Sequence, residues 1–144
     1  MSRIETAISF FRGDFNCAQS ILSTYCTKYG LDRNTALKLA TGFGGGIVRF
    51  GRTCGAVSGA CMVIGLKYGM GINENTELKE KTYEVIRNFS DRFQEINGSV
   101  ICRELLNCDI NTPEGKDYYI KNELFEKKCL QYVKNAAEIL EEIL

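Results

Sequence analysis

Cysteine is the residue type through which this sequence could do chemistry. Seven cysteines occur among 144 residues, and histidine is absent. Without imidazole the chain cannot build a Ser-His-Asp or Cys-His catalytic site, and soft metal ligands could only be thiolates. An odd number of cysteines cannot pair completely as disulfides, so the count favours thiol chemistry or metal binding. A structural role also stays open, because free cysteine packs well as a small hydrophobic residue.

Three cysteines fall at predicted helix starts. Each follows a residue that commonly caps a helix N-terminus, in the pairs Asn16–Cys17, Thr53–Cys54 and Ser99–Cys102. The first turn of a helix has free N–H groups and the positive end of the helix dipole, which together favour an anion. This environment lowers the pKa of a thiol and raises its reactivity. We therefore expect reactive thiolates at helix N-termini, with Cys54 as the first candidate.

The stretch Thr41–Gly71 surrounds Cys54 and is rich in glycine. The uncharged run Thr53–Leu66 predicts a buried central helix that extends to about Met70. Its small residues Gly51, Gly55 and Gly59 would share one face, where a second helix could approach closely. Lys67 interrupts the run before the length of about 20 residues that a membrane span needs. We expect no stable membrane insertion.

The loop before this helix combines Gly44, Gly45 and Gly46 with Arg49 and Arg52. It could cradle a phosphate at a helix start, but it matches no known phosphate-binding motif. A tight turn that lets Cys54 approach its partners explains the glycines better. The two arginines could also hold a thiolate or a small anion.

The rest of the chain predicts helices only. Apolar residues recur at three- and four-residue spacing, and no segment alternates with a period of two. We expect an all-α, single-domain bundle over residues 1–144, of about six or seven helices around the glycine-rich central one. The other predicted helices are 3–12, 17–29, 33–42, 76–96, 99–107 and 117–143, with an additional start signal at Thr112-Pro113-Glu114.

The composition limits the partners and the compartment. Lysine plus arginine and aspartate plus glutamate both number 18, so no net charge attracts nucleic acid. The N-terminal residues Met1–Glu5 form no apolar signal segment, which predicts a cytoplasmic protein. Dimerisation through the glycine-lined helix face is compatible with the sequence.

Four groups of residues resemble the C_GCAxxG_C_C family of redox-active proteins from bacteria and archaea. They are Asn16-Cys17-Ala18-Gln19; Gly42–Gly46 with Cys54-Gly55-Ala56-Val57-Ser58-Gly59; Cys102–Leu106; and Cys129 before Val133 and Ala136. The resemblance covers nearly the whole chain and implies that the four family cysteines are Cys17, Cys54, Cys102 and Cys129. It leaves Cys26, Cys61 and Cys108 as additional cysteines, which we expect to fill the core.

Three functions remain open from the sequence. The first is thiol/disulfide exchange or redox sensing, as in a thiol oxidoreductase, with an unknown redox partner. The second is electron transfer by an iron–sulfur cluster or another metal bound to the same four cysteines. The third is a helical accessory module with structural cysteines. No C-x-x-C pair occurs, so any joint site must be assembled by tertiary packing.

Overall fold

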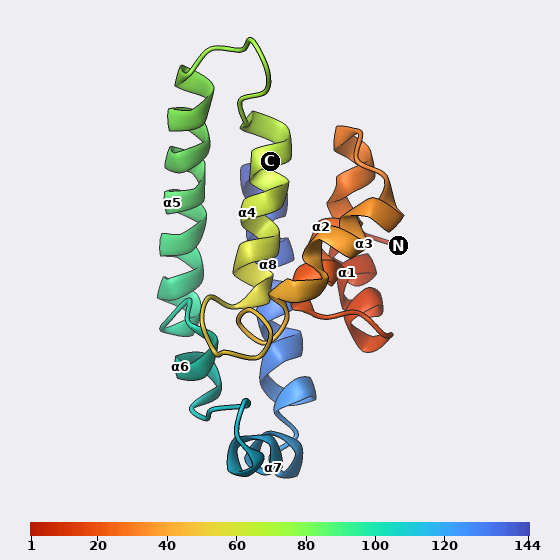
Figure 1. The fold of residues 1–144 in the computed structure, drawn as a ribbon, viewed down its shortest axis with the longest axis vertical. Helices are drawn as coiled ribbons and strands as arrows, with labels where there is room; N and C mark the ends of the chain where they lie inside the picture. The colour runs from red at the N-terminus through yellow and green to blue at the C-terminus, as the bar shows by residue number, and fades with distance from the viewer.

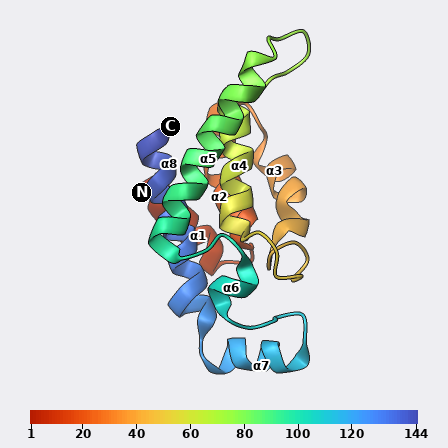
Figure 2. The same cartoon turned by 90° about the vertical axis from the view of Figure 1, so that its left-hand side faces the viewer.

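The computed structural model describes residues 1–144 as a bundle of eight α-helices without strands, which confirms the predicted all-α, single-domain fold. Figures 1 and 2 show four of its helices, α1, α2, α4 and α8, packed around one core, with α5 along one side and α7 crossing one end. The helices are α1 (Arg3–Arg12), α2 (Cys17–Tyr25), α3 (Arg33–Ala40), α4 (Gly55–Tyr68), α5 (Glu77–Asn97), α6 (Cys102–Leu106), α7 (Pro113–Lys121) and α8 (Leu130–Ile143).

Helix α4 is the predicted central helix, and it packs against α2, α5 and α8. Its closest neighbour is α2, and glycine makes that approach possible. A Cβ atom added at Gly59 would lie 2.9 Å from the carbonyl oxygen of Ala18 on α2, a distance that real Cβ atoms essentially never show. The predicted close packing is confirmed at Gly55 and Gly59, and it fixes the position of Cys17 relative to Cys54. Gly51, predicted on the same face, lies outside α4 with a left-handed φ of 76° and packs against Arg103.

Local signals predicted the N-terminal helices well. Asn16 caps α2 in a capping box with Gln19, and Asp32 caps α3 through the backbone N–H of Thr35. Helix α1 buries Ala7 and Phe11, as its apolar spacing predicted. A 3₁₀ turn, Cys26–Tyr29, prolongs α2 to the left-handed Gly30.

Two predicted caps are wrong. Thr53 does not cap α4, because it forms an antiparallel bridge with Ile101, and the cap is Cys54 itself. Ser99 does not cap α6, which begins at Cys102. The Ser99 hydroxyl instead accepts from the N–H of Ile101 and donates to the Glu104 carboxylate.

The long final helix predicted over residues 117–143 is also wrong in detail. Thr112 and Pro113 start α7 as predicted, but this helix ends at Lys121. Glu123 adopts a left-handed φ of 53° there. A single π-helical turn, Phe125–Cys129, then leads into α8.

Helix α5 buries Phe89 and Phe93 completely, but the ends of its predicted apolar stripe are exposed at Tyr83 and Ile96. The reason is that α5 packs against only α4 and α8, on one side. None of the helices is long and apolar enough to cross a membrane.

Candidate redox site

Cys17, Cys54, Cys102 and Cys129 all line one cavity of about 730 Å³. Its lining includes residues of α6, of α7 and of the glycine-rich segment Gly42–Gly51, which we call the glycine loop. Helix α7 crosses one end of the bundle, with α6 next to it (Figures 1 and 2). Each cysteine belongs to a different element: α2, the cap of α4, α6 and the π-helical turn before α8. All four are free thiols. Tertiary packing therefore assembles one site, as the absence of local cysteine pairs required.

Cys17 is held in place by the cap that precedes it. It is the first residue of α2, and the side-chain amide of Asn16 donates a hydrogen bond of 2.9 Å to the carbonyl oxygen of Thr41. That bond connects the start of α2 to Thr41, directly before the glycine loop. Gly44 lies against Asn16 so closely that a Cβ atom there would meet the amide nitrogen at 2.6 Å.

Backbone pairing positions Cys54 relative to Cys102. The Cys54 N–H donates to the carbonyl oxygen of Val100 at 2.8 Å, and the Cys102 N–H donates to that of Arg52 at 2.6 Å. These bonds flank the Thr53–Ile101 bridge. The head of α4 and the head of α6 are thus tied together although they are far apart in sequence.

Cys129 lines the cavity from the end of the π-helical turn Phe125–Cys129, which follows α7 in the sequence. The phenol of Tyr119 on α7 donates a hydrogen bond to its sulfur, with 3.7 Å between oxygen and sulfur. Tyr119 and Tyr132 also line the cavity. The Tyr132 hydroxyl donates to the carbonyl oxygen of Leu105, which anchors α8 to α6.

Burial dominates the titration of the four thiols. Cys54, Cys102 and Cys129 are 4%, 7% and 9% exposed, whereas Cys17 is half-buried. Burial raises the pKa of Cys54 and of Cys102 to about 12, and it raises the pKa of Cys17 and Cys129 as well. The expected low pKa at Cys54 is therefore wrong: the N–H groups of Ala56 and Val57 lower it, but less than burial raises it.

The four thiols also lie close enough to act on one another. The negative charges of Cys54, Cys129 and Cys102 each raise the pKa of Cys17. The charge of Cys129 also raises the pKa of Cys54, and the charges of Cys54 and Cys129 raise the pKa of Cys102. These charge effects agree with the placement of all four cysteines on the lining of one cavity.

The glycine loop contributes Gly44, Gly45, Gly46, Val48 and Arg49 to the lining of the cavity. Five successive residues, 45–49, have positive φ, including Ile47 and Arg49 at 67° each. Such conformations cost about 1–2 kcal/mol per non-glycine residue, so the loop is strained. Gly46 is required at φ 68° because a Cβ atom there would lie 2.8 Å from the Cβ of Cys102. The loop glycine therefore brings the backbone against Cys102, whereas the expectation named Cys54.

The same loop supplies hydrogen-bond donors that the protein does not use. Gly45, Gly46 and Ile47 donate their backbone N–H groups to no acceptor of the chain. Gly46 is buried, and a buried N–H group without a partner is rare in native structures. Because Gly45 and Gly46 line the cavity, an acceptor bound there would satisfy these donors.

The two loop arginines have different positions. Arg49 lines the cavity with the cysteines. Arg52 lies outside it, over the ring of Phe50 at 5.2 Å from the centroid. Only Arg49 can act on the contents of the cavity.

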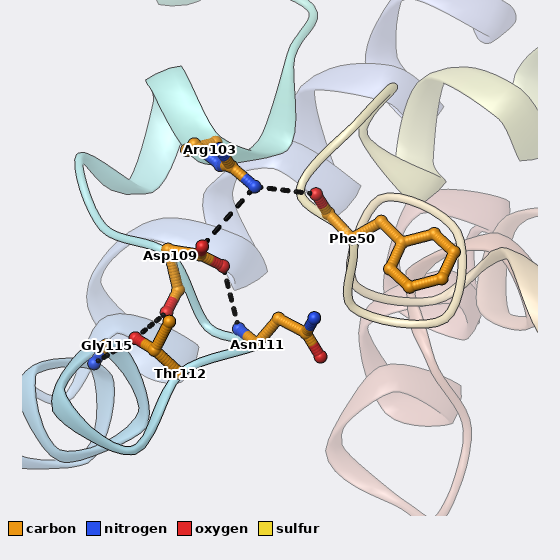
Figure 3. A network of polar contacts seen from close by, with 6 residues as sticks. All are labelled: Phe50, Arg103, Asp109, Asn111, Thr112 and Gly115. Carbon is orange, nitrogen blue, oxygen red and sulfur yellow. Dashed lines mark hydrogen bonds and ion pairs between the residues drawn. The ribbon is translucent and has the colours of Figure 1, made fainter.

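A polar network outside the cavity ties its two walls together (Figure 3). Arg103, next to Cys102, donates to the carbonyl oxygen of Phe50 at 3.1 Å and pairs with the Asp109 carboxylate at 3.4 Å. The carbonyl oxygen of Asp109 in turn accepts from the hydroxyl of Thr112, the cap of α7. The glycine loop, α6 and the start of α7 therefore keep a fixed relation around the site.

The chain matches one protein family over nearly its whole length. Residues 15–143 match the model of the family described as "Putative redox-active protein (C_GCAxxG_C_C)". The chain belongs to this family. No curated protein and no solved structure matches it.

The three cysteines outside the family pattern have different environments in this C_GCAxxG_C_C protein. Cys26 is fully buried in the core, and Cys61 packs against the core while partly exposed. Cys108 lies near enough to the site for its charge to raise the pKa of both Cys102 and Cys129. Cys108 also packs against the core, as expected, but no local motif in the sequence indicates its proximity to the site.

The spacing of the four family cysteines bears on which metal group could bind. No set of three or more cysteine, aspartate or glutamate side chains is grouped closely enough to hold a metal ion. The donor set is nevertheless uniform, because no carboxylate lines the cavity. Four thiols with no oxygen ligand suit a soft metal or an iron–sulfur cluster better than calcium or magnesium.

Proposed function

We propose that this protein is a small redox protein whose centre is the four-cysteine cavity, and that Cys17, Cys54, Cys102 and Cys129 hold an iron–sulfur cluster there. The observation that carries the proposal is the convergence of all four family cysteines on one cavity, where three of them are at most 9% exposed. Cys₄ ligation is the usual arrangement for such clusters. This places the cluster ahead of thiol/disulfide exchange, which the sequence alone favoured.

Three features of the cavity fit an iron–sulfur cluster. The four donors are all thiols, and Cys17, Cys54, Cys102 and Cys129 would hold the cluster as its ligands. The unused N–H groups of Gly45 and Gly46 suit a group with sulfur acceptors, since hydrogen bonds to sulfur are common around these clusters. Burial keeps water away from the centre and thereby tunes its potential.

When bound, the cluster would supply one-electron transfer. The chain's own part is then to hold and tune it. Four separate elements fix the thiolates, and the apolar residues of the lining, among them Leu105 and Leu106, exclude water. Tyr119 donates a hydrogen bond to the sulfur of Cys129, which stabilises negative charge on that ligand.

Thiol/disulfide exchange is the second candidate. It is favoured by the fact that all four thiols are free and line the same cavity, where two of them could form a disulfide. Two observations weigh against it as the main activity. Exchange needs an exposed thiolate, whereas three of the thiols are at most 9% exposed and the pKa of each is raised.

The test is iron and acid-labile sulfide analysis of protein purified without oxygen or chelators, together with electron paramagnetic resonance of the reduced form. We expect near-stoichiometric iron and sulfide and a visible charge-transfer absorption. Replacing Cys54, Cys102 or Cys129 by Ser should remove most of the iron. Cys61→Ser is the matched control and should retain it, because Cys61 lies outside the cavity.

The outcomes separate the two candidates. Metal-free protein in which mild oxidation reversibly removes two thiols would favour thiol/disulfide exchange over the cluster. Equal iron loss from Cys61→Ser and Cys54→Ser would show that the substitutions act through general destabilisation, and the ligand assignment would fail.

A further inference from the structure

We infer that the redox cavity also binds a small organic anion, held by Arg49 on the glycine loop and Lys116 on α7. The inference deepens the proposed redox function by naming the class of small molecule that reaches the centre. It rests on the lining of the cavity and on the two cations at its walls.

The size and lining of the cavity suit a small molecule. Its volume of about 730 Å³ falls in the range of ordinary ligand pockets, about 300–1,000 Å³. Most of the lining is hydrophobic, and Leu106, Ile110 and Ile120 contribute on the side of α6 and α7. An apolar wall with few charges binds the body of an organic molecule and leaves its orientation to the polar groups.

The charges on the lining have one sign. Apart from thiols and phenols, the only ionisable residues that line the cavity are Arg49 and Lys116, and no carboxylate accompanies them. The two cations are exposed residues that come from different elements, the glycine loop and α7. A pair of cations facing a largely apolar space selects an anionic head group.

Both cations are free. Neither side chain forms an ion pair, a hydrogen bond or a cation–π contact within the chain. The neighbouring arginines differ, because Arg52 lies over Phe50 and Arg103 pairs with Asp109. Arg49 and Lys116 are therefore available to a ligand.

The backbone of the loop supports the same conclusion. Arg49 has a left-handed φ of 67°, at the end of a strained segment, and strain of this kind persists where it serves a site. The strained backbone places the guanidinium-bearing residue on the lining of the cavity, where it has no partner in the chain.

The experiment measures binding of four probes by isothermal titration calorimetry at constant ionic strength. Benzoate and phenyl phosphate combine an apolar body with an anionic head, inorganic phosphate has the charge alone, and benzamide has the body alone. We expect benzoate or phenyl phosphate to bind in a one-to-one ratio and both other probes to bind at least about tenfold more weakly, since charge-assisted hydrogen bonds contribute that much.

Matched variants locate the site. Arg49→Gln and Lys116→Gln should each weaken binding of the organic anion by about tenfold or more. Arg52→Gln, on the same loop, and Lys121→Gln, on the same helix, should change it by less than about twofold, because neither residue lines the cavity. Binding that all four variants weaken equally would reflect general electrostatics and would overturn the proposal.

The test is separate from that of the cluster. Titrations run on both the iron-containing and the metal-free protein, and the iron content of each variant is measured. Absence of iron would defeat the cluster but leave the anion test intact. Loss of iron together with ligand binding in Arg49→Gln would mean that the arginine serves the cluster, and equal binding of benzamide and benzoate would mean that no anion site exists; either result overturns the inference.

Discussion

At the scale of single residues, Tyr119 is the side chain whose contact with the site is most specific. Its hydroxyl donates to the sulfur of Cys129 at 3.7 Å, and this bond lowers the pKa of that thiol against the effect of burial. A donor to a ligand sulfur stabilises the more negative, reduced state of a cluster. Tyr119 is therefore a positioning and tuning residue of the proposed centre.

We predict that Tyr119→Phe makes the midpoint potential of the cluster more negative by about 40 mV. Loss of one hydrogen bond of about 1 kcal/mol corresponds to this shift at 59 mV per tenfold change for one electron. Potentiometric titration followed by electron paramagnetic resonance measures it. Tyr118→Phe is the control, because Tyr118 is the exposed neighbour on α7, and a shift of the same size there would refute the assignment.

The residues also show which local signals were sufficient. Asn16 was predicted as a cap and Thr112-Pro113-Glu114 as a helix start, and the side chains of Asn16 and Thr112 each accept a capping backbone hydrogen bond. Thr53 and Ser99 have equally good types but do not cap, because a backbone bridge between Thr53 and Ile101 takes precedence. A pairing between segments so far apart in sequence leaves no local trace.

At the scale of elements, the packing of α4 on α2 predicts opposite effects for two glycines of one helix. A Cβ atom at Gly59 would lie 2.9 Å from a backbone oxygen of α2, whereas one at Gly65 would meet nothing within 4 Å. Gly65→Ala should raise the free energy of unfolding by up to about 1 kcal/mol, the helix propensity gain. Gly59→Ala should lower it by about 1–2 kcal/mol, because overpacking costs more than propensity returns.

Urea denaturation followed by circular dichroism measures both variants. Gly65→Ala serves as the control for the substitution itself, since it changes the same residue type in the same helix. If the two variants shift the midpoint in the same direction, the close approach of α2 and α4 does not limit the packing at Gly59.

The elements that sequence analysis misjudged lie at the site. Apolar periodicity across residues 117–143 predicted one helix, yet Glu123 breaks it with a left-handed backbone although neither glycine nor proline marks the break. The π-helical turn that follows brings Cys129 into the cavity. Both irregularities are set by tertiary packing, which overrides helix propensity where the cysteine must be placed.

At the scale of the whole molecule, the site depends on contacts between helices near the two ends of the chain. Cys17 and Cys129 are separated by most of the chain, but the packing of α1 and α2 on α8 brings them to one cavity. The sequence could predict the helical class, the four cysteines and the need for tertiary assembly. It could not predict that all four meet at one place, because that depends on the bundle's packing and not on spacing.

Burial of the thiols in this assembled core predicts how stability varies with pH in the metal-free, fully reduced protein. The pKa of Cys54 and of Cys102 is raised to about 12 in the folded state, against about 8.5 in the unfolded chain. Between these values the unfolded state binds fewer protons. The stabilisation is therefore complete below about pH 8.5 and is lost as the pH rises through about 12.

We expect the free energy of unfolding to fall by about 1.4 kcal/mol per pH unit for each such thiol above pH 8.5. Urea denaturation between pH 7.5 and 10, under argon with a phosphine reductant, measures the slope. Cys54→Ala should reduce this slope by about 1.4 kcal/mol per pH unit, the contribution of one thiol. Val57→Ala removes buried apolar surface from the same helix without removing a titrating group, so it should lower stability equally at every pH. A flat profile in the unsubstituted protein would mean that the thiols are solvated, and the buried site would then not exist in solution.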